Sequence, residues 1–128
     1  MIRTYGLVGL CCCLLSAGLM VSGLSVAGEA DVLNVTITRS GNHQYDFSVT
    51  VRHDDSRWEH YASKWEIVDP AGNLLATRTL LHPHVGEQPF TRSLRSVAIP
   101  AGITTVKVRA YDSVHQYGGT EIRVALPQ

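Results

Sequence analysis

The stretch "YDFSVTVR" (residues 45–52) decides the fold class. Every second side chain from Tyr45 to Val51 is apolar or aromatic, and the residues between them are polar. Because successive side chains of a β-strand point to opposite faces of a sheet, this alternation predicts a strand with one buried and one exposed face. An amphipathic helix would instead repeat its apolar positions every third or fourth residue. We therefore expect an all-β protein.

Similar short segments follow one another along the rest of the chain. They are separated by turns rich in Gly, Asn and Pro at 40–42, 69–73 and 100–102, residues that supply or fix the backbone angles of turns. Only 56–63 could hold a helical turn. Seven short strands in about a hundred residues predict one antiparallel, immunoglobulin-like β-sandwich. The remaining predicted strands are 32–39, 64–68, 74–81, 92–99, 104–111 and 120–126.

The first 27 residues have the layout of a secretory signal peptide. A single positive charge at Arg3 precedes an apolar run over 7–24, and small residues end the segment at Ala27. We expect export to the periplasm or the cell exterior, with cleavage after Ala27 or alternatively after Ala30. An uncleaved membrane anchor is the other interpretation, since the apolar run approaches the length of a bilayer span. The predicted organisation is a signal peptide over 1–27 and a sandwich domain over 28–128, with no membrane insertion after cleavage.

The composition of the exported part limits its chemistry. All three cysteines lie at 11–13, and the two methionines are Met1 and Met20. The domain therefore has no disulfide, thiolate ligand or soft Cu(I) site. We interpret the cysteines as apolar filler of the leader, because Leu10 is too large for the position before a lipid-attached Cys11; lipid attachment at a cysteine is the alternative. The formal net charge of zero gives no basic surface for nucleic acid.

Several segments resemble known proteins. Trp65 on the third predicted strand and "IPAGITTVKVRAYD" (99–112) resemble the immunoglobulin and fibronectin type III superfold, and the resemblance implies a two-sheet sandwich. The loop segments "HDDSRWEHYASKW" and "HPHVGEQPFTR" look like motifs of exported bacterial proteins of unassigned function. "HPHVGE" is also similar to the histidine and glutamate motif of cupins, which implies a small metal-binding barrel as an alternative fold. We expect Trp65, Ile67 and Phe90 in the core.

The histidines are concentrated at one end of the predicted sandwich. In a sandwich of sequential antiparallel strands the second, fourth and sixth connections share one end. These are the long connections, and they hold five of the six histidines. They also carry carboxylates, and loops on a rigid scaffold commonly carry function. The residues concerned are His53, His60, His82, His84 and His115, with Asp54, Asp55, Glu59, Glu87 and Asp112.

Imidazole and carboxylate ligands together suit Zn or Cu(II). His82 and His84 are two apart, so both would project to one side of an extended segment that Pro83 stiffens. We expect this pair at the centre of a metal site that His53, His60, His115 and Glu87 complete. Glu87 could instead orient a histidine. The alternative for each histidine is a polar loop residue that bonds backbone, and Asp54 and Asp55 could equally cap a turn.

Two classes of function follow. The first is non-catalytic metal binding, delivery or sensing in the cell envelope, with an envelope or metal-handling protein as partner. No nucleophile elbow, phosphate loop or metalloprotease helix motif occurs in the sequence. The second is an adhesion or interaction module for a protein or glycan, because aromatic side chains on loops supply binding surface. Its candidate residues are Trp58, Tyr61, Phe90 and Tyr117, beside Asp54, Asp55 and Asp112.

Overall fold

The computed structural model describes residues 28–128, and the predicted signal peptide lies outside them. The described part is all-β, with seven strands and no helix, which confirms the predicted fold class and strand count. No helix there is long and apolar enough to cross a membrane. The strands are β1 (Asp31–Gly41), β2 (Gln44–Arg52), β3 (Ala62–Val68), β4 (Leu74–Thr79), β5 (Phe90–Ala98), β6 (Thr105–Asp112) and β7 (Ile122–Ala125).

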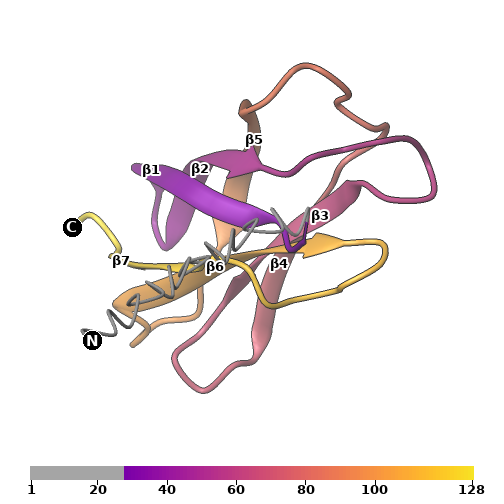
Figure 1. The fold of residues 1–128 in the computed structure, drawn as a ribbon. Helices are drawn as coiled ribbons and strands as arrows, with labels where there is room; N and C mark the ends of the chain where they lie inside the picture. Colours follow the sequence, from indigo (N-terminus) through magenta and orange to yellow (C-terminus); the bar gives the residue numbers. More distant parts are fainter. Residues whose placement is uncertain (1–27) are drawn as a thin grey trace, which may run out of the picture.

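The strands form two antiparallel sheets (Figure 1). One sheet has the order β1-β2-β5 and the other the order β4-β3-β6-β7. Each strand pairs antiparallel with its neighbours, with irregular register in β1, β2 and β3. This arrangement of seven strands differs from the eight-stranded double Greek key of a jelly roll. The cupin-like alternative therefore does not fit the described chain.

The core lies between the inward faces of the two sheets. The alternation that predicted β2 is realised, because Tyr45, Phe47, Val49 and Val51 are all buried. On the opposite sheet Trp65 and Ile67 of β3, together with Val106, Val108 and Ala110 of β6, meet them. Phe90 is buried too, so the three predicted core residues are confirmed. Burial of this apolar surface is the main favourable contribution to folding.

Two of the inward-facing rows continue past the apolar core with polar side chains. His53 stands two residues after Val51, and Asp112 stands two residues after Ala110. Because side chains alternate with a period of two, both point inward like the residues before them. His53 is 3% exposed and Asp112 is 0% exposed. A histidine from one sheet and a carboxylate from the other therefore close the same end of the core.

The three long connections meet at this end. The β2–β3, β4–β5 and β6–β7 loops extend to the same side of the molecule, at the right of Figure 1. The predicted helical turn at 56–63 is wrong, because Arg57 and His60 instead form an isolated antiparallel bridge. A tight turn between these two residues brings the His60 side chain back over the sandwich end.

Candidate metal centre

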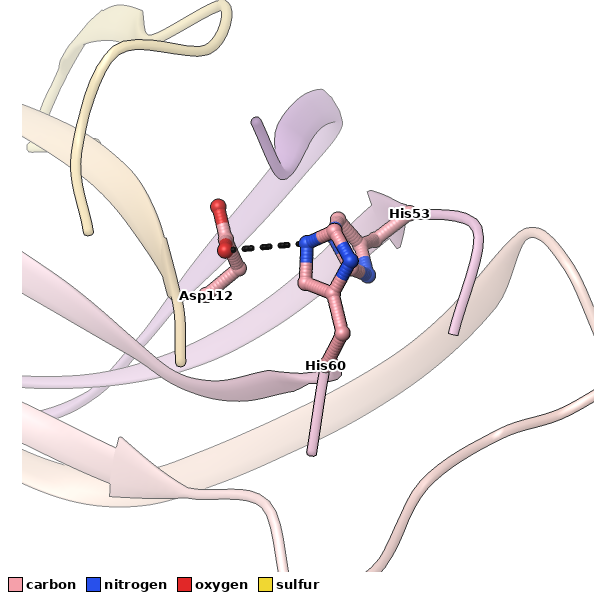
Figure 2. A group of neighbouring side chains, drawn as sticks. All are labelled: His53, His60 and Asp112. Carbon is pink, nitrogen blue, oxygen red and sulfur yellow. Dashed lines mark hydrogen bonds and ion pairs between the residues drawn. The ribbon is translucent and has the colours of Figure 1, made fainter. Parts of the chain in front are cut away.

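Three side chains converge at the loop end of the sandwich. His53, His60 and Asp112 each offer one ligand atom, and these atoms all lie within 4.8 Å of one another (Figure 2). The Nε2 atoms of the two histidines are 3.2 Å apart, and His60 Nε2 is 3.2 Å from Asp112 Oδ1. Around an ion with bonds of about 2.1 Å, neighbouring ligands lie about 3.0 Å apart in an octahedron and about 3.4 Å apart in a tetrahedron. Two of the three observed spacings fit neighbouring ligands of one divalent ion, and the third pair, His53 and Asp112, lies within 4.8 Å.

Each ligand is held by a different structural element. His53 ends the inward row of β2, and Asp112 ends that of β6. His60 comes from the β2–β3 loop, where its N–H donates to the Arg57 carbonyl at 3.2 Å and its carbonyl accepts from Ser56 N–H at 3.0 Å. The first two positions are therefore fixed by the sheets, and the third is fixed by the fold of one loop.

Asp55 orients His53 toward the cluster. Its Oδ1 lies 2.5 Å from His53 Nδ1 and accepts from Ala62 N–H at 2.9 Å. Its Oδ2 accepts from His84 N–H at 2.7 Å. The ring therefore donates Nδ1–H to the carboxylate and directs Nε2 toward His60 and Asp112. A carboxylate behind a histidine is the usual support of a metal-bound imidazole, since it fixes the tautomer and raises the basicity of the ligand.

Nearby charges and hydrogen bonds shift the pKa values of the residues in and beside the cluster. Burial disfavours the charged form of His53, but the hydrogen bond that His53 donates to Asp55, the charges of Asp55 and Asp112, and the hydrogen bond to the Gly28 carbonyl outweigh burial and raise its pKa. Burial likewise opposes ionisation of Asp55, but its bonds with His53, His84 and Ala62 lower its pKa. Without a metal, the two carboxylates therefore favour a proton on His53, and a bound cation would replace that proton.

One carboxylate oxygen of Asp112 has no partner in the described chain. Oδ1 accepts from the backbone N–H groups of Val114 at 2.9 Å and His115 at 2.7 Å. These bonds overcome burial and lower the pKa of Asp112. Oδ2 is buried and makes no hydrogen bond with residues 28–128. The oxygen that faces His60 is Oδ1, at 3.2 Å from His60 Nε2 (Figure 2).

His115 lies beside the three ligands. Its ring centroid is 5.0 Å from that of His60, and its Nδ1 is 3.3 Å from Asp112 Oδ1. It is partly exposed on the β6–β7 loop. A small rotation of this side chain would supply a further nitrogen ligand from the solvent side.

The predicted central pair, His82 and His84, stands outside this cluster. Their rings are tilted by 32° with centroids 4.5 Å apart, and His84 stacks on Phe90 at 3.9 Å. The group of converging ligand atoms found within residues 28–128 includes neither ring. His84 Nε2 also accepts from the Arg92 guanidinium at 2.8 Å. Burial, then the charges of Arg92 and His82, lower the pKa of His84, so it is a neutral packing residue.

The other predicted site residues are spread over the same end and its flank. Asp54 and Glu87 are exposed, and Glu87 N–H donates to the His84 carbonyl at 3.3 Å. Trp58 is 62% exposed, and its ring meets that of Tyr61 edge-on at 5.5 Å. Tyr117 lies over the Arg109 guanidinium and donates its hydroxyl to the buried Glu66, on the outward face of the four-stranded sheet.

Sequence reasoning placed His53 and His60 among the ligands, but it listed Asp112 only as a general binding residue and gave no role to Gln88. A signal was present for Asp112, because it continues the apolar alternation of β6. No local pattern marks Gln88, whose side-chain oxygen accepts from His53 N–H at 2.9 Å and whose amide donates to the His84 carbonyl at 3.1 Å. Such a long-range contact depends on the packing of two loops.

A shallow polar hollow lies elsewhere, on the outward face of the three-stranded sheet. Its lining includes Thr36 and Thr38 of β1, Ser48 of β2, and Ser93 and Arg95 of β5. None of the clustered histidines lines it. The metal-type chemistry and this hollow are therefore separate features.

Comparison with known proteins gives a relative that is longer than this chain. Over 91 residues the chain is 44% identical to a protein of Halomicrobium mukohataei named "Putative lipoprotein". The matched part is 71% of this chain and 44% of that protein, so the chain spans less than half of the relative's length. No protein-family profile and no solved structure matches the chain.

Proposed function

We propose that residues 28–128 form an exported domain that binds one divalent transition metal ion, Zn(II) or Cu(II), through His53, His60 and Asp112. The convergence of the three ligand atoms within 4.8 Å carries this proposal. The carboxylate of Asp55 behind His53 supports it independently.

The ligand chemistry supports the choice of metal. Two imidazoles and one carboxylate suit borderline ions such as Zn(II) and Cu(II). The His60 side chain is 20% exposed, so a metal beside it is reachable from solvent and could pass to a partner. This accessibility favours delivery or sensing of the metal over a closed structural site. We propose no catalytic step.

The fold and the location enter the proposal as well. We assign the sandwich to the immunoglobulin and fibronectin type III superfold, on the basis of its three- and four-stranded sheets and the buried Trp65 on its third strand. An envelope location is supported by the leader-like sequence of 1–27 and by the lipoprotein name of the Halomicrobium mukohataei relative. An envelope protein that donates or accepts metal is the partner that this location implies.

The test is metal content and titration calorimetry with Zn(II) and Cu(II) on the exported protein without a histidine tag. We expect about one ion per chain and submicromolar affinity. His60→Ala should weaken binding by more than the 10–100-fold that loss of a supporting residue typically costs. His43→Ala is the matched control, because His43 lies in the β1–β2 turn at the other end of the sandwich. Equal binding by both variants, or no binding by the native protein, would overturn the proposal.

A second candidate function is an interaction surface beside the metal. The observation that favours it is Trp58, which is 62% exposed on the same loop as His60 and stacked edge-on against Tyr61. Exposed aromatic side chains are typical anchors of protein interfaces. Trp58→Ser should then abolish capture of an envelope partner but leave metal affinity unchanged, and an unchanged partner profile would remove this candidate.

A further inference from the structure

The first described residue of the domain lies against the metal cluster. The carbonyl oxygen of Gly28 is 3.1 Å from His53 Nε2, and Gly28 is buried. That spacing matches the 3.2 Å between His53 Nε2 and His60 Nε2. The Gly28 carbonyl oxygen accepts a hydrogen bond from His53 Nε2 in the metal-free cluster, so it is adjacent to the atom that would bind the ion. Gly28 directly follows Ala27, the predicted cleavage position.

The start of the domain is hydrogen-bonded to the β6–β7 loop, which directly follows Asp112. The β6–β7 loop begins after Asp112, and its Thr120 N–H donates to Asp31 Oδ1 at 2.7 Å. Val32 N–H donates to the Thr120 carbonyl at 2.8 Å. At Gly119 a Cβ atom would stand 2.0 Å from the Ala30 carbonyl oxygen, so the two segments touch backbone to backbone. Gly28 is therefore held at the cluster by its own neighbours.

We propose that removal of the leader completes the metal site, an inference that rests on the proposed function. Hydrolysis of the Ala27–Gly28 peptide bond adds the hydroxyl of water to the Ala27 carbonyl carbon and a proton to the Gly28 nitrogen. Before cleavage that nitrogen shares its lone pair with the Ala27 carbonyl and is a poor ligand. After cleavage it is a free amine. Amine and Gly28 carbonyl oxygen then close a five-membered ring with the metal beside His53.

The two predicted cleavage positions have different consequences for this site. Cleavage after Ala30 would remove both Gly28 and the side chain of Ala30, which is 1% exposed in the core cluster. Cleavage after Ala27 keeps both. Completion of the site therefore requires cleavage after Ala27, which makes Gly28 the amino terminus.

The first experiment identifies the amino terminus of the protein as it is made. The full-length chain is expressed in a host that exports it, and the mass of the purified product is measured. We expect a product that begins at Gly28. A product that begins at Asp31, or one that retains the leader, would overturn the inference without touching His53, His60 and Asp112.

The second experiment compares that product with the same protein carrying residues 25–27 of the leader, so that Gly28 remains in a peptide bond. Both contain the whole core, and their metal-free unfolding curves confirm equal folding. We expect the free Gly28 form to bind Cu(II) and Zn(II) on the order of tenfold or more tightly, because the amine is tethered beside the ion at high effective concentration. In protein labelled with ¹⁵N-glycine, the Cu(II) electron paramagnetic resonance spectrum should show a ¹⁵N ligand only in the free form.

The outcomes separate the two proposals. Equal affinity of the two forms, with no ¹⁵N coupling, would overturn completion by Gly28 while the three-residue site stands. Absence of binding in both forms would overturn the metal site itself, and the inference with it. His43→Ala in the free form is the matched control, since His43 lies in the β1–β2 turn at the other end of the sandwich and the variant should keep the gain in affinity.

Discussion

Asp55 is the residue that joins the two groups of histidines. One carboxylate oxygen holds the His53 ring and Ala62 N–H, and the other holds the backbone of His84. The candidate metal cluster and the β4–β5 loop are thus linked through the buried Asp55, and Gln88 forms a second link between His53 and His84. A substitution at Asp55 should therefore affect both the cluster and the β4–β5 loop. A substitution at the exposed Asp54 should affect neither.

Asp55→Asn should therefore weaken metal binding and lower stability together. The amide keeps the shape but loses the charge that supports His53 Nδ1–H, and loss of such a supporting group typically costs about 10–100-fold in metal affinity. Its NH₂ group would also face a backbone donor, a mismatch that costs about 1–3 kcal/mol. Calorimetry and denaturant unfolding measure the two effects, with Asp54→Asn as control. An unchanged affinity would show that Asp55 does not position His53.

His84→Ala separates the sequence prediction from the geometry. Its ring is buried between His82 and Phe90, so we expect a loss of about 2–4 kcal/mol in unfolding free energy from the cavity left behind. Metal affinity of the folded protein should stay within a few-fold of native, because the ring nitrogens face Arg92 rather than the cluster. If a folded His82→Ala/His84→Ala protein no longer binds metal, the metal site would lie in the β4–β5 loop.

For two of the three candidate ligands, the sequence pattern could have predicted the direction of the side chain as well as its chemical type. His53 and Asp112 continue the period-two rows of β2 and β6, so their inward direction follows from strand parity. His60 could not be placed in this way, because its position depends on the bridge with Arg57. The stacking of His84 on Phe90 also requires a loop packing that no local pattern specifies.

At the scale of elements, the strands form where apolar and polar residues alternate. The β2–β3 loop, in contrast, does not adopt the conformation that its local sequence favours. Asp54 and Asp55 before 56–63 are typical of a helix start, and they suggested a helical turn there. In the fold, both carboxylate oxygens of Asp55 accept hydrogen bonds from His53, Ala62 and His84. Asp55 therefore does not cap a helix. Long-range hydrogen bonds in the buried loop end thus override a local capping signal.

The contact between the domain start and the β6–β7 loop gives a prediction at this scale. Gly119→Ala would force a Cβ to within 2.0 Å of the Ala30 carbonyl oxygen, and two backbones cannot both yield cheaply. We expect a loss of more than about 3 kcal/mol in unfolding free energy, typical of severe steric conflict. Gly41→Ala is the control, since its nearest contact is the flexible Gln44 side chain at 3.1 Å. Similar unfolding midpoints for the two variants would show that residues 28–32 are not fastened there.

At the scale of the whole molecule, the buried charges set how stability varies with pH when no metal is bound. Asp55 and Asp112 have lowered pKa values, so their stabilisation is present above the ordinary value of 3.8 and is lost as the pH falls through the folded pKa. His53 has a raised pKa, so its stabilisation is present below 6.5 and is lost as the pH rises through the folded pKa. In a His84→Ala background, which removes the opposite contribution of the lowered His84 pKa, the metal-free domain should be most stable in weak acid, measured as unfolding free energy across the pH range.

A bound metal ion should stabilise the domain more at higher pH, where the metal-free domain loses the contribution of His53. The ion needs the lone pair of His53 that the proton occupies in the metal-free cluster, so binding strengthens as the pH rises. A saturating ion adds about 2.7 kcal/mol of stability at a free concentration one hundred times Kd. The gain from a fixed concentration of Zn(II) should therefore be larger at pH 7.5 than at pH 5.5, and His60→Ala should lose most of it. Equal gains at both pH values would mean that the ion binds elsewhere, because only a site that competes with protons for imidazole couples metal binding to pH in this way.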